Sequence, residues 1–429
     1  MKVLLIDTYG DSLDLALRAQ ACGHEVVQYI SPSERKYELV GKGLVKRTGD
    51  FTAHLKGADL TVVCDNVKNL VVLDRFRADN PKAAVFGPNV EGARWEIDRL
   101  VGMKVLEKHG IDCPPIQLCS TYEQAVAHVK KRDTRLVCKP CYEADKCLSY
   151  CSKGPEDMLF MLAKWKQEGH MSKGQFVLQD FIPGVEFAVG GYMGRDGFAG
   201  GWEENFEFKK LMPGDIGPNT GEMGTVLQIV KKSKLAAQVL MPLERALLEI
   251  GYTGDVDVNC IIDEKGNPWP LEFTMRMGYP ALQIQTALFP DDPVAWMYDL
   301  ATGRAEPEFK QNTVSLGVAV CMSPFPYDHA PGALACDFPV YGVTPYNRDK
   351  LHPYHIQKGK TSEWATAGLY ALIVTGTSDT VSGAAENTYR TLKQLVIPGS
   401  PIYREDIGKK LSSALPRLQG FGYAQQFRY

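Results

Sequence analysis

Hydrophobic positions in residues 1–90 alternate between the spacing of buried strands and the spacing of amphipathic helices. Four short apolar runs predict strands: KVLLID, HEVVQYI, ADLTVVCDN and AAVFGPN. Between them, SLDLALRAQACG and the residues before position 80 have helical spacing. Alternating strands and helices predict a parallel sheet with helices on both faces. The first strand-to-helix turn, DTYGDS, contains one glycine, so the glycine-rich dinucleotide pattern is absent and a dehydrogenase is disfavoured.

The rest of the chain mixes helices with longer strand pairs. Helical spacing covers residues 91–112, 155–168, 229–250 and 281–303, whereas RLVCKP and QFVLQDFI predict strands. FAVGGYM and FAGGWEENFEF are expected to pair across the turn GRDG, and a glycine-rich loop is expected over 213–224. Near the C-terminus, VSLGVAVCM and LYALIVTGT predict strands and SGAAENTYRTLKQL a helix, which indicates a small α+β unit.

One predicted hairpin, GDVDVNCIIDEKGNPWPLEFTMRMG at 254–278, has a polar face of unusual composition. Side chains alternate between the two faces of a strand, so each half of the hairpin has one polar and one apolar face. A turn centred between Lys265 and Gly266 places the polar side chains in three facing pairs: Asn259 with Glu272, Asp257 with Thr274, and Asp255 with Arg276. A solvated sheet face is one interpretation. The other is a Mg²⁺ site next to a phosphate, because oxygen ligands suit Mg²⁺ and arginine suits phosphate.

Length and composition narrow the class of protein. The chain has 429 residues, enough for roughly two to four domains. Its net charge of −3 gives no electrostatic case for nucleic acid or an anionic membrane as a partner. The N-terminal apolar run leads directly into Asp7 and Asp11, so a buried strand is expected and not a signal peptide. Eleven cysteines, an odd number, point to reduced thiols and a cytoplasmic location.

Four cysteines cluster in sequence: Cys138, Cys141, Cys147 and Cys151. The pair Cys138 and Cys141 has the spacing that begins many zinc sites. However, Cys138 ends an apolar strand pattern, and no second pair follows at finger-like spacing. Ordinary, partly buried thiols are therefore the favoured interpretation.

Three segments carry groups suited to a nucleotide, although each also has a structural explanation. Lys139 at a strand end and Lys146 in the next loop can contact phosphates, or can be ordinary surface lysines. In QDFIPGVEF, main-chain groups can bond a base edge and Glu186 can accept ribose hydroxyls, or Glu186 is a turn residue. GPNTGEMG, at 217–224, has a backbone that can approach an anion closely, or it is a structural turn.

These pieces occur in the order found in ATP-grasp ligases, and the whole chain resembles the phosphoribosylamine–glycine ligase family. The resemblance implies a mixed α/β and α+β architecture: an N-terminal α/β domain over 1–95, an ATP-grasp domain over 96–310 with a lid at about 115–180, and a C-terminal α+β domain over 311–429. The segments that carry the resemblance are VFGPNVEGARWE, GIDCPP, Lys139, QDFIPGVEF, the KK and GPNTGEMG of residues 209–224, GYTG, LEFTMRMGYP and SPIYREDIGKK.

The resemblance also implies an activity and a set of site residues. The reaction is phosphoryl transfer from ATP to a carboxylate, followed by attack of an amine on the acyl phosphate. ATP and Mg²⁺ (or Mn²⁺) are the implied cofactors, small molecules are the implied partners, and the chain is expected to be a monomer or homodimer. The implied metal ligand is Glu272, with Asn259, Asp257 and Thr274 as further candidates, and the implied catalytic residues are Arg276, Lys210 and Asn219. The implied ATP contacts are Arg99, Lys139, Lys146, Gln179, Asp180, Phe181, Ile182 and Glu186. The implied substrate contacts are Asp7, Asp11, Gly217, Pro218, Asn219, Thr220, Gly221 and Glu222.

Several positions depart from the family pattern. Thr274 stands where the family has a metal-binding asparagine, and Glu222 stands where it has a glycine. The loop CYEADKCLSY contains no glycine, and DTYGDS replaces a Gly-Gly-Arg-Glu-His loop that helps hold a sugar phosphate. Three hypotheses remain open: synthesis of glycinamide ribonucleotide, the same chemistry on a different amine or acid, and a non-catalytic nucleotide-binding relative. Acidic DTYGDS and Glu222 suit a cationic or hydroxyl-rich acceptor in the second hypothesis.

Overall fold

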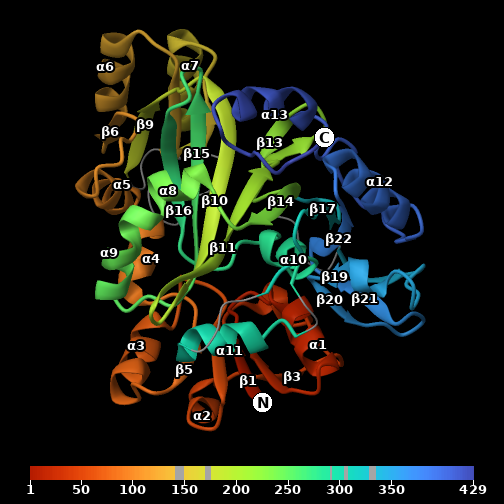
Figure 1. Ribbon diagram of the computed structural model, residues 1–429. Coiled ribbons are helices and arrows are strands. Elements are labelled where there is room, and N and C mark those ends of the chain that lie inside the picture. Colours follow the sequence, from red (N-terminus) through yellow and green to blue (C-terminus); the bar gives the residue numbers. More distant parts are fainter. Residues whose placement is uncertain (141–148, 170–174, 290–291, 304–307, 328–334) are drawn as a thin grey trace.

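A five-stranded parallel sheet forms the N-terminal part of the chain (Figure 1). The computed structural model describes residues 1–140, 149–169, 175–289, 292–303, 308–327 and 335–429. Val3 and Leu5 pack into one hydrophobic cluster and Leu4 and Ile6 into another, so both faces of the sheet are buried, as predicted. Its strands, in spatial order, are β3 (Lys46–Thr48), β2 (Glu25–Tyr29), β1 (Lys2–Ile6), β4 (Leu60–Val63) and β5 (Ala84–Phe86), and its helices are α1 (Leu13–Ala21), α2 (Thr52–Leu55) and α3 (Leu70–Asp79).

An eight-stranded antiparallel sheet occupies the centre of the molecule (Figure 1). Strands β10 and β11 form the hairpin predicted across GRDG, and Gly194 pairs with Gly197 at its turn. The spatial order is β16 (Pro268–Thr274), β15 (Gly254–Asp263), β10 (Gly184–Gly194), β11 (Gly197–Glu207), β14 (Gly224–Val230), β17 (Val314–Cys321), β22 (Tyr370–Ser378) and β19 (Leu351–Pro353). The strands predicted near the C-terminus therefore continue the central sheet.

Smaller elements surround the two large sheets. A four-stranded sheet stands above the central one and carries helices α6 (Tyr122–Arg132) and α7 (Pro155–Gln167). Its strands are β6 (Ile116–Cys119), β9 (Phe176–Asp180), β7 (Leu136–Pro140) and β8 (Tyr150–Cys151). On the C-terminal side lie β18 (Cys336–Val340), β20 (Ile356–Lys358), β21 (Trp364–Ala367), α12 (Val381–Leu392) and α13 (Leu411–Gly420). In the described ranges, every helix is too short or too polar to cross a membrane.

Some element boundaries differ from the sequence predictions. The helix expected over 229–250 begins later, because 224–230 is a fully buried strand between β11 and β17, and only α8 (Lys234–Val239) and α9 (Glu244–Glu249) are α-helical. Asp98 divides the helix expected over 91–112 into α4 (Val90–Ile97) and α5 (Arg99–Lys108), since its carboxylate caps α5. The helix expected over 281–303 contains α10 (Ala281–Thr286) and α11 (Ala295–Thr302). Part of the predicted loop at 213–224 pairs as β12 (Lys210–Met212) with β13 (Ile216–Asn219).

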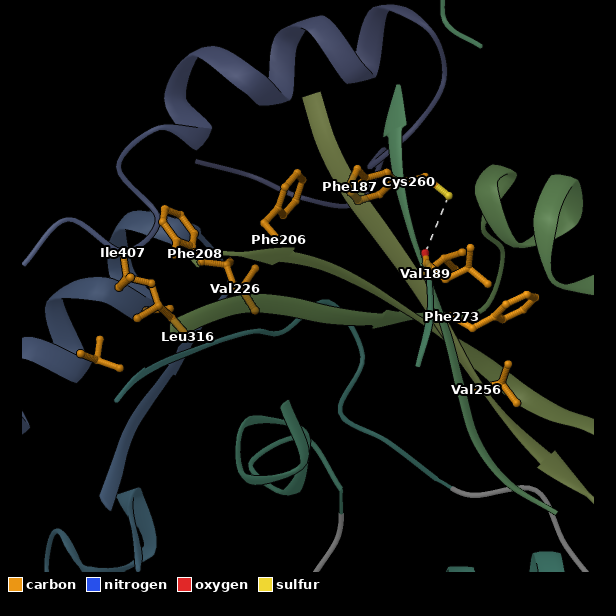
Figure 2. Close-up of a cluster of buried hydrophobic side chains, with 14 of the residues drawn as sticks. Phe187, Val189, Phe206, Phe208, Val226, Val256, Cys260, Phe273, Leu316 and Ile407 are labelled. Atoms are coloured by element: carbon orange, nitrogen blue, oxygen red, sulfur yellow. Dashed lines mark hydrogen bonds between the residues drawn. The ribbon is translucent and has the colours of Figure 1, made fainter. Parts of the chain in front are cut away.

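One face of the central sheet is apolar and buried (Figure 2). Phe187, Phe206 and Phe273 come from β10, β11 and β16 and belong to one cluster, which helices α8 and α13 cover. Each buried side chain of this size contributes about 2–3 kcal/mol to stability. A slip of one residue would turn this face outward and place the intervening carboxylates in the apolar core, so the core fixes the register of the opposite, polar face.

Candidate functional site

The candidate site lies on the polar face of strands β16, β15, β10 and β11. In the hairpin of β15 and β16, Asn259 pairs with Glu272 and Asp257 pairs with Thr274, as the sequence predicted. Between Asn259 and the turn, a β-bulge shifts the register by one residue, so Cys260 pairs with Pro270; the pairs beyond the bulge keep the predicted alignment. Arg276 lies beyond the end of β16, where its guanidinium is 3.2 Å from a carboxylate oxygen of Glu96.

Cationic side chains gather around Glu272. An Nη atom of Arg99 lies 2.9 Å from Glu272 Oε2, and Lys209 Nζ lies 3.6 Å from its Oε1. Burial alone would raise the pKa of Glu272, but Arg99, Lys209 and Lys139 hold it well below its usual range. The carboxylate is therefore ionised at neutral pH, as a metal ligand requires.

Lys209 connects this group to the carboxylates of the neighbouring strands. Its Nζ lies 2.9 Å from both Glu186 Oε1 and Glu207 Oε2. Although burial opposes its charge, Glu186, Glu207 and Glu272 raise the pKa of Lys209 well above its usual range. The Asn259 amide also donates to Glu186 and Glu207, at 3.0 and 2.7 Å. Glu186, predicted to accept ribose hydroxyls, thus faces the site with one oxygen already bonded.

Lys139 faces the same group from β7 of the upper sheet. Burial and the nearby charge of Arg99 lower the pKa of Lys139 to about 7, although Glu272 opposes this shift. Lys139 is pushed towards neutrality by the neighbouring cation Arg99, and a highly charged anion bound here would favour its protonated form. Arg99, Lys139 and Lys209 together therefore form a potential phosphate-binding group.

The oxygen atoms near this group fit a divalent cation. Asn259 Oδ1 is buried, and no hydrogen-bond partner reaches it among the described residues. It lies on β15 directly across from the ionised Glu272, with Asp257 and Thr274 as the next pair. Carboxylate, amide and hydroxyl oxygens are the donors that Mg²⁺ prefers. No group of three His, Cys, Asp or Glu side chains in the described ranges is close enough to enclose a metal, so substrate or water oxygens would complete the coordination.

A second, more acidic group lies further along the same face. The Asn205 amide donates to Glu203 at 3.1 Å and to Asp257 at 3.0 Å. Gln285 donates to Glu203 and, at 3.4 Å, to Asp255. Burial and its neighbour Asp255 raise the pKa of Glu203 to about 8, and burial raises that of Asp255 to about 7. The polar face thus has a cationic end and an acidic end.

The predicted adenine-side linker consists of the last two residues of β9 and the two residues after it. Gln179 is buried, and its amide nitrogen lacks a partner among the described residues, as expected for a donor that awaits a ligand. Asp180 forms an ion pair with Arg132, and the Arg135 guanidinium lies 3.5 Å from the centre of the Phe181 ring. Ile182 is half-buried. Lys146 lies outside the described residues, as do Cys141 and Cys147; Cys138 is buried and Cys151 exposed.

The predicted substrate loop leaves the β12–β13 hairpin. Asn219 donates to the carbonyl of Ser149 at 2.8 Å, and Thr220 donates to that of Lys209 at 2.8 Å. Lys210 bonds within the hairpin, to the carbonyl of Gly217 at 3.2 Å. In this arrangement Lys210 and Asn219 hold the loop in place, and contacts of theirs with a substrate stay a prediction. Pro218 is half-buried and Gly217 and Gly221 are exposed, whereas Glu222 turns inward and is buried.

The N-terminal loop is organised by Asp7. Its carboxylate accepts the backbone N–H groups of residues 10–12 at 2.7–3.1 Å, and also bonds the Ser12 hydroxyl and the Gln28 amide. Burial and the neighbouring Asp11 raise the pKa of Asp7 to about 7. Asp7 therefore shapes the loop, while Asp11 is partly exposed and lies 3.4 Å from His355. Contact of either residue with a substrate stays a prediction.

Sequence reasoning missed five polar residues of this face: Glu203, Asn205, Glu207, Lys209 and Gln285. The first four alternate along β11 and the residues just after it, and that period of two was the available signal. Which residues they meet depends on β10, which pairs Ala188 with both Asn205 and Asn259.

Comparison with known proteins places this geometry in a known context. No family model matches the chain. It is 25% identical over 440 residues to a phosphoribosylamine–glycine ligase of Ralstonia nicotianae, covering 96% of this chain and 99% of the relative. A Streptococcus pneumoniae protein of the same name is also 25% identical, with the same coverages.

Solved structures agree on the fold. The phosphoribosylamine–glycine ligase of Thermotoga maritima has a TM-score of 0.73 at 20% identity, covering 95% of this chain and 100% of that one. A biotin carboxylase of Campylobacter jejuni has a TM-score of 0.63 at 14% identity, covering 98% and 97%. The mixed α/β and α+β fold of ATP-grasp enzymes and the resemblance to phosphoribosylamine–glycine ligases, both predicted from sequence, are confirmed.

Proposed function

Because this chain has the ATP-grasp fold and resembles phosphoribosylamine–glycine ligases along its length, we propose that it is an ATP-dependent ligase joining a carboxylate to an amine. Within that family the simplest reaction joins glycine to phosphoribosylamine to give glycinamide ribonucleotide. The observation that carries the proposal is the meeting of Arg99, Lys139 and Lys209 around the ionised Glu272. A cytoplasmic location and a monomeric or dimeric state remain predictions.

The geometry assigns a role to each group. Arg99, Lys139 and Lys209 neutralise the charge of a triphosphate and of the phosphoryl group as it moves to the carboxylate. Gln179 and the following backbone orient the adenine. Glu272 and Asn259 would hold Mg²⁺, with Asp257 and Thr274 beside them, and that ion supplies further charge neutralisation. The amine then attacks the acyl phosphate, and inorganic phosphate leaves.

The activity is tested by trapping the acyl phosphate. Wild-type protein is incubated with ATP, Mg²⁺, hydroxylamine and a panel of carboxylic acids that includes glycine, and both ADP and hydroxamate are measured. In Glu272→Gln we expect both products to fall at least about a hundredfold, because the ionised ligand is lost. Circular dichroism checks that the variant is folded.

Glu249→Gln is the matched control, since Glu249 is an exposed carboxylate on α9 that pairs with Arg245. It should turn over like wild type. Wild-type rates in Glu272→Gln would overturn the assignment of Glu272 as a metal ligand. Failure of the wild-type protein to form hydroxamate with any acid of the panel would count against ligase activity.

A further inference from the structure

Four carboxylates come together on the acidic end of the polar face: Glu203, Asp255, Asp257 and Glu222, here called the acidic group. Strand β10 pairs Gly190 with Glu203 on one side and with Asp257 on the other. A side chain at Gly190 would begin 3.3 Å from Asp257 Oδ2 and 3.5 Å from Glu203 Cβ. A side chain at this position would crowd Asp257, so the glycine lets the two carboxylates approach β10 closely from both sides.

Nearby cations are committed to other partners. Lys209 bonds Glu186 and Glu207, and Arg276 bonds Glu96. Among the described residues no lysine or arginine forms an ion pair with a member of the acidic group. Burial and repulsion from Glu207 raise the pKa of Glu222 well above its usual range. The acidic group therefore has no ion-pair partner among the described residues, although the charges of Lys209 and Arg276 partly stabilise ionised Glu222 and Asp255.

Two buried oxygen atoms of this region also lack a hydrogen-bond donor. Glu222 Oε1 and Asn205 Oδ1 have no partner among the described residues, and their residues are 6% and 3% exposed. The amide nitrogen of Asn205 bonds Glu203 and Asp257, so its side chain lies within the acidic group. A buried acceptor without a donor costs free energy, and a ligand with several N–H groups would remove that cost.

Aromatic rings lie near both Glu222 and Asp11 of the N-terminal loop. The Tyr370 hydroxyl donates to the carbonyl of Glu222 at 2.8 Å, and its ring centre lies 4.7 Å from that of Tyr354. Tyr279 is 6.1 Å from Tyr354 on the other side, and Asp11 lies close to both Tyr354 and Tyr370. Rings next to carboxylates are a favourable environment for an alkylammonium ion, through cation–π attraction.

We propose that the amine substrate is a cationic amine without a phosphate group, bound with its ammonium between Glu203 and Glu222 and its body beside Tyr354 and Tyr370. This inference rests on the ligase function proposed above and names the class of its amine substrate. A phosphate on that substrate would meet carboxylates here, where a sugar-phosphate site needs cations.

The acidic group also accounts for a proton. An ammonium ion has no lone pair, so one N–H proton passes to a carboxylate of the acidic group; Glu222 is assigned this role because its Oε1 has no hydrogen-bond partner among the described residues. The nitrogen lone pair then attacks the carbonyl carbon of the acyl phosphate and forms the C–N bond. The bond between the carbonyl carbon and the bridging phosphate oxygen then breaks. Phosphate leaves with that electron pair and takes the second proton of the amine.

The test measures two steps separately: formation of the acyl phosphate, here called the acid half, and reaction with the amine, here called the amine half. Binding of 1,4-diaminobutane, tyramine and inorganic phosphate to wild-type protein is measured by calorimetry, and ADP release is followed with each amine and with phosphoribosylamine made in situ. Hydroxamate formation reports the acid half, because hydroxylamine is neutral at pH 7.5 and small enough to react without the acidic group.

Glu222→Gln keeps the shape of the side chain and removes its ability to ionise. We expect it to weaken binding of the preferred diamine or arylalkylamine at least about tenfold and to lower amine-dependent ADP release by a larger factor than hydroxamate formation. Glu204→Gln is the matched control: Glu204 is the buried neighbour of Glu203 on β11, but it faces the opposite side and accepts a bond from Ser233. That control should bind amines like wild type.

Each remaining outcome decides the inference. Phosphoribosylamine as the preferred acceptor, unchanged in Glu222→Gln, would overturn it, as would the absence of binding by both cationic amines in wild type. Equal losses in Glu222→Gln and Glu204→Gln would show a general structural effect and overturn it as well. Hydroxamate failure with intact amine binding would count against the ligase function alone.

Discussion

Arg404 offers a sharp test of how the C-terminal segment positions the substrate loop. Its side chain is 1% exposed, and its guanidinium bonds both oxygens of Asp406 at 2.8 Å. It also donates to Asp215 at 2.8 Å and to the carbonyl of Lys210 at 3.0 Å. Lys210 and Asp215 belong to the β12–β13 hairpin that leads to Glu222, so Arg404 connects that hairpin to SPIYREDIGKK.

The substitution Arg404→Met removes four charge-assisted or carbonyl bonds and leaves two carboxylates without the guanidinium. Removing one partner of a buried ion pair costs about 3–5 kcal/mol. Asp215 is 44% exposed and keeps Lys410 at 3.2 Å, so the lower value of about 3 kcal/mol applies. If that cost falls on the hairpin alone, its amides should open about 100-fold more often, since 1.4 kcal/mol is a factor of ten.

Hydrogen exchange measured by mass spectrometry on peptides covering residues 209–224 is the assay. Arg390→Met is the matched control, because Arg390 and Glu386 form an exposed pair, 62% and 74% exposed, worth less than about 0.5 kcal/mol. Exchange in the hairpin should not change in the control. The reasoning is refuted if Arg404→Met accelerates exchange of the hairpin less than tenfold, or accelerates exchange equally throughout the chain.

Two further predictions follow from buried charges. Lys139 has a pKa of about 7 and must be protonated to bind a triphosphate, so the Kd for ATP should rise by about tenfold or more from pH 7 to pH 9. In Lys139→Met, calorimetry should show weak binding of ATP that hardly depends on pH. The same pH dependence in this variant as in wild type would contradict the prediction. Asp7→Ala leaves the amides of residues 10–12 without their acceptor and should lower the free energy of unfolding by about 3 kcal/mol. Asp50→Ala, in an exposed turn, should leave the urea midpoint almost unchanged, and equal urea midpoints for the two variants would contradict the prediction.

Local sequence patterns determined the features that depend on neighbouring residues. The period of two over 254–278, with a polar turn at its centre, was enough to predict that Asn259 faces Glu272 and Asp257 faces Thr274. Alternating strands and helices likewise predicted the N-terminal parallel sheet. The segments that resemble ATP-grasp ligases predicted the fold, because their order along the chain can be read from the sequence alone.

The tertiary structure decided which distant side chains meet. The run at 224–230 is apolar on both faces, and only its place between β11 and β17 makes it a strand. Arg404 lies nearly 200 residues from Asp215, and the two meet because the C-terminal segment packs against the hairpin.

The division of the polar face into a cationic and an acidic end has the same origin. Lys209 and Glu203 lie on one side of β10, and Glu272 and Asp257 on the other, so the register of β10 selects their partners. A strand's own sequence specifies which side chains share a face, since alternation is local. Which strand lies beside it is specified by burial of the apolar face, which involves residues from the whole chain.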